Sequence, residues 1–339
     1  MAWFEDEKVI FSESLSHSVE DLRPFASIAD QKDFRLKLIL LALKNHGQRL
    51  SSLDAVVGRG GLLRPIPGGT YIVSKAMLHD LEEAARGEHA SNLGAIIAFD
   101  IGKEANVPAF IVDPVVVDEM EDVARISGMP EIERVSIFHA LNQKAVARRA
   151  AGELGKPVSE IQLIVAHLGG GISVGCHCRG RVVDVNNALN GEGPFSPERS
   201  GGLPSAQLAE LCFSGQFTKP EILKKIYGKG GMVAYLGTND MKEVTKKIES
   251  GDKKARLVYE AMSYQVAKEI GSLAAVLKGK VDGIVITGGL AFDSGFVDKV
   301  RERVDWIARV FVYPGEGEME SLATGALRIL RKEEKARTY

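Results

Sequence analysis

The sequence predicts an α/β protein with mixed sheets flanked by helices, and α+β layering is the alternative. Strand-like and helix-like runs alternate along all 339 residues. Apolar residues make up 45% and charged residues 26%, as in ordinary globular proteins. The 36 glycines exceed the usual share of about 7%, so many tight turns are expected. The length suits two domains of about 100–200 residues each. Because no Ser/Gly-rich or Pro-rich linker separates them, we expect structured connections and a hinged cleft.

The first half of the chain is expected to begin with a helix over residues 31–46. Its apolar side chains have helical spacing, and Gly47 follows as a C-cap. The short apolar run 54–58 predicts a buried strand. The same patterns predict, in order, a helix at 92–105, a strand at 108–112, a helix at about 138–154 and a strand at 161–166.

The second half is expected to be mostly helical between residues 205 and 277, ending in a long helix from about residue 253. The apolar run 282–286 then predicts a buried strand that meets Gly288 and Gly289. The remaining elements are expected to be a helix, a short strand at 310–312, a loop that holds Glu316, Glu318 and Glu320, and a final helix at about 321–331.

Composition excludes several classes of protein. A net charge of −2 argues against general nucleic-acid binding, which normally needs a basic surplus. Three cysteines are too few for a disulfide framework and indicate a reducing compartment. The acidic first residues do not resemble a signal peptide, and no apolar run approaches the roughly 18–20 residues that span a bilayer. We therefore expect a cytoplasmic protein without a membrane or nucleic-acid partner.

The most informative segment is 163–204. An apolar strand runs into His167 and the glycines Gly169, Gly170 and Gly171, and the β-branched run that follows predicts a second strand. Glycines let backbone N–H groups close on an anion, because no side chain blocks the approach. Arg199 follows in a Pro/Gly-rich loop and offers a planar charged fork. The segment therefore predicts a site for phosphoryl groups.

The glycine spacing disfavours two other nucleotide sites. A dinucleotide-binding loop needs G-x-G-x-x-G between a strand and a helix, whereas Gly169, Gly171 and Gly175 miss that spacing and precede a strand. No G-K-[ST] sequence follows a glycine loop, so a Walker A loop is absent too. A nicotinamide-dependent dehydrogenase is therefore disfavoured. A strand followed by glycines recurs at 283–289, which suits two related nucleotide loops or simply the frequent occurrence of glycine after buried strands.

Several single residues have both a functional and a structural interpretation. In GRGGLLRPIPGG, Arg59 and Arg64 are flanked by Gly60, Gly61, Gly68 and Gly69, which favours an anion site over a plain turn. Asp113 follows an apolar strand, which is a common position for an active-site carboxylate. Alternatively it is the N-cap of a helix whose first residue is Pro114. His139 follows the strand-like run 135–138 and opens a helix, where a structural role is favoured. For His167 the ligand-facing and structural roles are about equal.

The triplet of Cys176, His177 and Cys178 invites a metal site. Alternate residues of a strand face opposite sides, so the two cysteines share a face that His177 does not. No second C-x-x-C or H-x-x-x-H sequence lies nearby. We expect a structural role for all three.

Five motifs occur in order along nearly the whole chain: GRGGLLRPIPGG, RVSIFHALNQKAVARR, AHLGGGISVG, PFSPERSGGLP and VITGGLA. Together they resemble the butyrate kinase family of the acetate and sugar kinase/Hsp70/actin superfamily. The resemblance implies a two-domain actin-like (ribonuclease H-like) fold with ATP and substrate in a central cleft. It implies domain I at 1–115 plus 321–339 and domain II at 116–320. It also implies that the cofactors are ATP/ADP and Mg²⁺ and that the substrates are a small carboxylate and its acyl phosphate. The expected assembly is a homodimer or a higher homo-oligomer.

The resemblance also implies roles for individual residues. Arg59 and Arg199 match the active-site arginines, with Arg64 as an alternative to Arg59, and Asp113 matches an active-site aspartate. His139 matches a histidine that contacts the transferring phosphoryl group. The segment from His167 to Gly171 matches the second phosphate loop, and Gly288 and Gly289 match the adenosine loop. Glu320, or alternatively Glu318, matches a glutamate associated with Mg²⁺.

The chain departs from the family at its start. Butyrate kinases usually begin with an apolar strand and a loop like NPGSTSTK, whereas MAWFEDEKVIF resembles the strand after that loop. We therefore expect the central strand of domain I and the first phosphate loop to be missing. Either the start is mis-assigned and the protein is an active kinase, or it is a nucleotide-binding protein with little or no kinase activity.

The implied reaction suits these residue types. A carboxylate substrate, with a pKa near ~4–5, is already ionised at neutral pH and needs no strong general base. The difficulty is bringing one anion towards another, which positive charge and amide donors ease. The expected function is reversible phosphoryl transfer between ATP and butyrate or a branched short-chain acid. The length of the acid rests on the resemblance alone.

Overall fold

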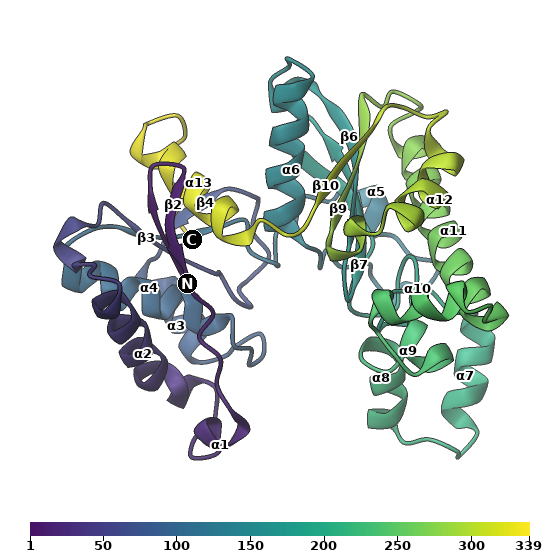
Figure 1. Cartoon of the computed structure of the whole chain (residues 1–339), viewed down its shortest axis with the longest axis horizontal. Coiled ribbons are helices and arrows are strands. Elements are labelled where there is room, and N and C mark those ends of the chain that lie inside the picture. Colours follow the sequence, from purple (N-terminus) through teal and green to yellow (C-terminus); the bar gives the residue numbers. More distant parts are fainter. The chain divides into compact units, whose positions relative to one another are not determined.

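The computed structural model describes residues 1–339, apart from the side chain of Val19. Contacts within the chain divide it into two compact units. Unit 1 comprises Met1–Val117 and Gly317–Tyr339, and unit 2 comprises Asp118–Glu316. Each unit combines a mixed sheet with helices, which confirms the α/β prediction (Figure 1).

The sheet of unit 1 has the strand order β3-β5-β4. The central strand β5 (Ala109–Val112) is parallel to β3 (Val56–Gly58) and antiparallel to β4 (Thr70–Ile72). The strands expected at 54–58 and 108–112 are therefore confirmed. The carboxyl ends of β3 and β5 lie side by side, because Gly58 is in register with Ile111.

Helices cover both faces of this sheet. On one face α4 (Asn92–Ala105) buries Ile96 and Ile101 against Ile111, and α2 (Lys32–Asn45) packs on α4. On the other face α13 (Glu318–Leu330) brings Gly325 against Val112. The remaining elements of unit 1 are β1 (Ala2–Glu5) and β2 (Lys8–Ser12), which pair as a hairpin, α1 (Val19–Leu22), α3 (Lys75–Glu82), and 3-10 helices at Ala29–Gln31 and Leu50–Ser52.

The last helix begins earlier than expected. Gly317 adopts a left-handed φ of 51° and precedes the first turn of α13, which contains Glu318 and Glu320. The prediction that these two glutamates lie in a loop is therefore wrong. Carboxylates in a first helical turn interact favourably with the exposed backbone N–H groups, which accounts for the early start.

The sheet of unit 2 has the strand order β10-β9-β6-β7-β8. Its strands are β6 (Gln162–Leu168), β7 (Ile172–Cys178), β8 (Arg181–Val185), β9 (Gly283–Gly288) and β10 (Val310–Pro314). Strands β6, β9 and β10 are parallel, whereas β6, β7 and β8 form antiparallel pairs. The expected hairpin around the three glycines is confirmed.

Helices also cover both faces of the unit 2 sheet. On one face α6 (Ala140–Glu153) packs small side chains such as Ala147 and Ala150 against Leu163. On the other face lie α11 (Lys253–Val276) and α12 (Ser294–Val304) (Figure 1). The remaining elements are α5 (Asp122–Arg125), α7 (Ser205–Phe213), α8 (Lys219–Tyr227), α9 (Gly231–Leu236), α10 (Met241–Glu249), and 3-10 helices at Val158–Glu160 and Gly289–Phe292.

The strand-like run 135–138 does not form a strand. Its Ile137 carbonyl accepts one hydrogen bond from the Ala188 backbone N–H at 2.9 Å, without a ladder on either side. Phe138 is buried while Val135 is 46% exposed, so the apolar residues anchor an irregular segment that leads into α6. Among the described residues, no helix is long and apolar enough to cross a membrane.

Candidate active site

Two glycine segments meet at one edge of the unit 2 sheet. His167 of β6 is in register with Thr287 of β9, so the turn after β6 and the glycines that end β9 lie at the carboxyl ends of neighbouring parallel strands. Gly288 has a φ of 89°, and a Cβ atom there would overlap the Leu168 carbonyl. Ligands of α/β proteins bind at such strand ends. The structure therefore brings the predicted loops at 169–171 and 288–289 together.

A pocket of about 300 Å³ opens beside these loops. Its walls are formed by Gly169, Gly170, Pro197, Glu198, Asn239, Gly289, Leu290 and Glu316. Glycines on two sides leave backbone amides uncovered for an anion. The carboxylates of Glu198 and Glu316 are hydrogen-bond acceptors, which suit hydroxyl or amino groups of a ligand. Asn239 donates to Glu198 at 2.6 Å and holds one of these carboxylates in place.

His167 is buried beside the glycine turn, with 1% of its surface exposed. Its Nδ1 lies 2.8 Å from Oδ1 of Asn142, whereas its Nε2 is buried without a hydrogen-bond partner. A Cβ atom on Gly169 would lie 3.2 Å from that Nε2, so the atom is beside the turn. Burial lowers the pKa of His167 well below its usual range, and nearby His139 lowers it further. A buried polar atom without a partner is typical of a site that takes a ligand or water.

His139 lies directly against His167. It is the N-cap residue of α6 and is half-buried, and its Nδ1 lies 2.8 Å from Oγ of Ser173. The two imidazole rings stack with centroids 3.8 Å apart and planes 11° from parallel. The structure thus pairs two histidines that are 28 positions apart in the sequence.

Arg199 packs on the other side of the same turn. Its guanidinium donates to the Ala188 carbonyl at 2.5 Å, and a Cβ atom on Gly171 would overlap it. Its Nε is buried without a partner. Ser196 ties the loop to the turn by donating to the Gly170 carbonyl at 2.6 Å. Burial lowers the pKa of the guanidinium, but its normal value is so high that the group stays charged.

Arg59 and Asp113 follow neighbouring parallel strands in unit 1. Arg59 comes after β3 and forms an ion pair with Glu318, while Asp113 comes after β5. Asp113 is 1% exposed and accepts a hydrogen bond from the Gly69 backbone N–H at 2.6 Å. Its φ of 37° is in the left-handed region, which favours Asp, Asn and Gly. The alternative role as a helix N-cap is wrong, because a turn with a hydrogen bond from Val117 to Pro114 follows instead of a helix.

Arg64 is occupied by the C-terminal residue. Its backbone N–H and its Nε both lie 3.0 Å from the Tyr339 hydroxyl, and its guanidinium lies 4.5 Å from the centre of that ring. Asp80 accepts from the same hydroxyl at 2.7 Å and lies 3.1 Å from Arg64. These contacts favour Arg59 as the arginine available for a ligand.

Glu320 is exposed in the first turn of α13. In the part of the chain that the structure describes, no group of three or more His, Cys, Asp or Glu side chains is arranged to hold a metal ion. The association of Glu320 with Mg²⁺ therefore stays a prediction.

Comparison with known families decides which proteins this chain is related to. The model of the acetokinase family matches residues 131–308, more than half of the 339 residues. The protein belongs to the acetokinase family. The matched range contains the unit 2 residues at the glycine loops and the pocket, apart from Glu316.

Solved structures of acetate and propionate kinases share the fold of this protein. Acetate kinase from Porphyromonas gingivalis is 22% identical, with a TM-score of 0.75 over 88% of this chain and 84% of that chain. Propionate kinase from Francisella tularensis subsp. tularensis SCHU S4 is 20% identical, with a TM-score of 0.68 over 86% and 83%. Acetate kinase from Entamoeba histolytica is 17% identical, with a TM-score of 0.71 over 88% and 84%. The protein therefore has the α/β fold of these kinases, as its motifs led us to expect.

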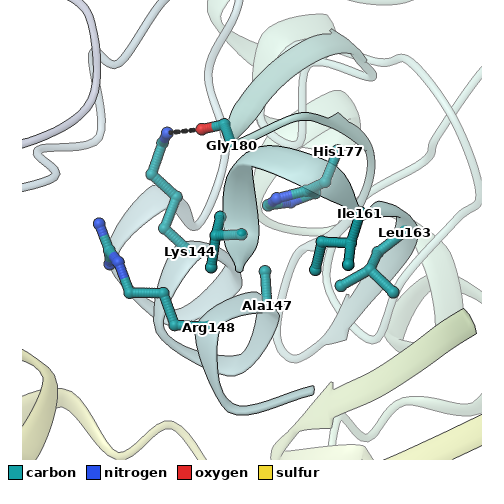
Figure 2. Close-up of a pocket in the computed structure, with 8 residues that line it drawn as sticks. Lys144, Ala147, Arg148, Ile161, Leu163, His177 and Gly180 are labelled. Atoms are coloured by element: carbon teal, nitrogen blue, oxygen red, sulfur yellow. Dashed lines mark hydrogen bonds between the residues drawn. The ribbon is translucent and has the colours of Figure 1, made fainter. Parts of the chain in front are cut away.

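The Cys176–Cys178 triplet lies on β7, away from the glycine turn. Both cysteines pack into the core beneath α11, and burial raises the pKa of the Cys176 thiol to about 12. His177 points to the opposite face, beside Lys144 and Ala147 of α6 (Figure 2). The cavity there measures about 20 Å³, roughly the space of one water molecule and far too small for a nucleotide. These contacts support the expected structural role.

Three buried residues of the site escaped the sequence analysis. Asn142 and Gln143 lie on α6, and Ser173 lies on β7, with exposures of 7%, 0% and 0%. All three bond to the histidine pair or to each other. A signal was available, because two adjacent amides stand with Lys144 among the alanines that this helix buries. Buried polar side chains need partners, and the nearest candidates were the histidines.

Proposed function

We propose that this acetokinase transfers a phosphoryl group reversibly between ATP and a short-chain carboxylate, giving ADP and an acyl phosphate. The observation that carries the proposal is the packing of Arg199 and the stacked pair His139 and His167 around a glycine turn. Membership of the acetokinase family supports it. The solved acetate and propionate kinases support the same class of substrate.

The residues at the turn suit transfer between two anions. Arg199 supplies a permanent positive charge, and Gly170 and Gly289 have no side chain that would keep phosphate oxygens from the backbone. His139 supplies a further polar contact for the transferring group. A carboxylate acceptor is already ionised, so the neutral, buried His167 is not required as a strong base.

We assign the pocket of about 300 Å³ beside Gly169 and Gly289 to ATP and ADP. The unpartnered buried Nε atoms of His167 and Arg199 fit this assignment, because a phosphate with its water would supply the missing contacts. Mg²⁺ would neutralise phosphate charge when bound. Glu320 is the better candidate to hold its water shell, because Glu318 is paired with Arg59.

In unit 1 we assign Arg59 and Asp113 to the substrate. Both follow the carboxyl ends of parallel strands, and Asp113 is a buried carboxylate held in a strained left-handed conformation. Such strain is typical of functional sites. We further propose that the acid is butyrate or a branched short-chain acid, on the evidence of the sequence motifs, and that the protein forms a homodimer or higher homo-oligomer.

The test is an assay of acyl phosphate formation with ATP, Mg²⁺ and a panel of acids. The panel contains acetate, propionate, butyrate, isobutyrate and longer branched acids. We expect turnover that is highest with butyrate or a branched acid. Arg199→Ala protein, purified in parallel, controls for a contaminating kinase.

Two outcomes would contradict the proposal. ATP binding without acyl phosphate from any acid would indicate a nucleotide-binding protein instead of a kinase. Turnover that is highest with acetate would agree with the proposed reaction but would contradict butyrate or a branched acid as the substrate.

A further inference from the structure

Two adjacent amides of α6 hold the two stacked histidines, and their orientations follow from simple chemistry. A backbone carbonyl can only accept a hydrogen bond. Asn142 Nδ2 lies 2.7 Å from the Glu316 carbonyl, and Gln143 Nε2 lies 3.0 Å from the Ser173 carbonyl. Both nitrogens must therefore face these carbonyls. The side-chain oxygens of Asn142 and Gln143 are consequently the atoms that meet the imidazoles.

The bonds around Gln143 all run in one direction. Its Nε2 also donates to Oγ of Ser173 at 2.8 Å. Oγ also accepts from the backbone N–H of His139 at 3.5 Å, so both of its lone pairs are used. Its single hydrogen is therefore left for Nδ1 of His139, 2.8 Å away. In a neutral imidazole one nitrogen accepts and the other carries the hydrogen. The hydrogen of neutral His139 must therefore be on Nε2.

The far end of this chain of bonds agrees with that direction. Gln143 Oε1 lies 3.0 Å from Nε2 of His177, so that nitrogen must be a donor. Burial lowers the pKa of His177 to about 3, which keeps the ring neutral with its hydrogen on Nε2. The order of donation is His177 to Gln143, then to Ser173, then to His139.

The hydrogen bond between Asn142 and His167 places the hydrogen of His167 on the opposite ring nitrogen, Nδ1. Oδ1 of Asn142 accepts from Nδ1 of His167 at 2.8 Å. The neutral ring therefore has a lone pair on Nε2, the buried atom beside Gly169 that has no partner in the protein. A lone pair at this place accepts a hydrogen from a neutral donor, such as a water molecule or a hydroxyl group.

We propose that Gln143 and Ser173 are positioning residues that hold His139 with its hydrogen on Nε2, while Asn142 holds His167 with its hydrogen on Nδ1. The stacked rings then offer different chemistry to a ligand. His139 donates a hydrogen bond, which suits an anionic phosphoryl oxygen, and His167 accepts one. The use of the donor rests on the proposed function, but the placement of the hydrogens does not.

The first test is NMR of the whole protein labelled with ¹⁵N at histidine, with signals assigned from His139→Gln and His167→Gln. We expect the neutral ring of His139 to show a protonated Nε2 and a bare Nδ1, and the neutral ring of His167 to show the reverse. The same form in both rings, or the reverse arrangement, would overturn the inference.

A matched pair of variants tests the role of each amide. In Gln143→Glu a carboxylate oxygen replaces the Nε2 donor and accepts a hydrogen bond from the Ser173 hydroxyl. That hydroxyl then no longer donates to His139. Nδ1 of His139 should then gain a hydrogen. Asn142→Asp is the same isosteric change one position away, but it keeps the oxygen that holds His167. His167 should keep its hydrogen on Nδ1. Unchanged ¹⁵N signals of His139 in Gln143→Glu would contradict the proposal.

The second test is kinetic. Ser173→Ala removes the hydroxyl that orients His139, so kcat should fall about tenfold to a hundredfold while the KM for the acid changes less than about twofold. The ¹⁵N signals of His139 should also change, because Nδ1 loses the donor that keeps the hydrogen of the neutral ring on Nε2. Ser263→Ala is the control, because this buried hydroxyl bonds only within α11, to the Glu260 carbonyl at 2.9 Å.

The results separate the two proposals. If the wild-type protein makes no acyl phosphate but shows the two expected histidine forms, the proposed function fails and the hydrogen placement stands. If it is active but Ser173→Ala matches Ser263→Ala in both kcat and the His139 signals, the positioning role fails.

Discussion

His139 and His167 stack with ring centroids 3.8 Å apart and planes only 11° from parallel. Two imidazolium cations so close together, one of them buried, would repel strongly. The lowered pKa of His167 agrees with this, since burial and the neighbouring ring both disfavour its charged form. Arg199 therefore supplies a permanent positive charge at the glycine turn, and the neutral His167 contributes through hydrogen bonds.

Replacing Arg199 with alanine should reduce kcat by about 10²–10³-fold, the usual cost of removing one donor to a transition-state anion. The folded state should change little, because the guanidinium is half-buried and only its bond to Ala188 is lost. Steady-state kinetics and thermal unfolding check both parts. Arg256→Ala, an exposed position on α11, is the matched control. Near-normal turnover in a folded Arg199→Ala protein would remove Arg199 from the site.

Arg59→Ala and Arg64→Ala should behave differently. Within the part of the chain that the structure describes, Arg59 forms an ion pair only with the partly exposed Glu318. Its loss should therefore mainly lower kcat/KM for the acid, by about tenfold or more. Arg64 lies in the network of Tyr339 and Asp80, so its loss should mainly lower the midpoint of thermal unfolding. Kinetics and unfolding of both variants give the comparison. A larger kinetic loss in Arg64→Ala would reverse the assignment.

Gly288→Ala and Gly289→Ala should separate folding from binding. A methyl group at Gly288 would overlap the Leu168 carbonyl and strain a φ of 89°, so we expect a loss of about 2 kcal/mol or more in stability. A methyl group at Gly289 meets no atom within 4 Å but enters the pocket. That variant should keep its stability and show a raised KM for ATP. Equal stabilities of the two variants would contradict this packing.

His177 should make the protein less stable in acid. Its pKa is about 3 in the folded state and about 6.5 when unfolded, so the unfolded chain binds a proton more readily between these values. The contribution of His177 to the free energy of unfolding is therefore fully present above pH 6.5 and is lost as the pH falls towards 3. In His177→Gln the difference in urea midpoint between pH 7 and pH 5 should shrink. His89→Gln, at an exposed histidine, is the control, and an unchanged pH dependence in His177→Gln would refute the assignment.

Local patterns in the sequence were sufficient for much of this fold. The hairpin around Gly169 to Gly171 follows from β-branched residues on both sides of three glycines, and the helices at 92–105 and 253–277 follow from apolar periodicity. These features depend on neighbours in the chain. The pattern was misleading at 135–138, where apolar residues anchor an irregular segment, and at Glu318, where a left-handed Gly317 starts the helix early.

The sequence by itself determined the motifs: the glycines that can approach an anion, and the arginines and histidines beside them. Tertiary structure decided which of these side chains are engaged. Arg64 is held by Tyr339, 275 positions away, and Ser173 reaches His139 across 34 positions. Such pairs arise because strands and helices distant in the sequence share one sheet edge. The direction of each hydrogen bond then depends on carbonyls, such as those of Ser173 and Glu316, that no local pattern identifies.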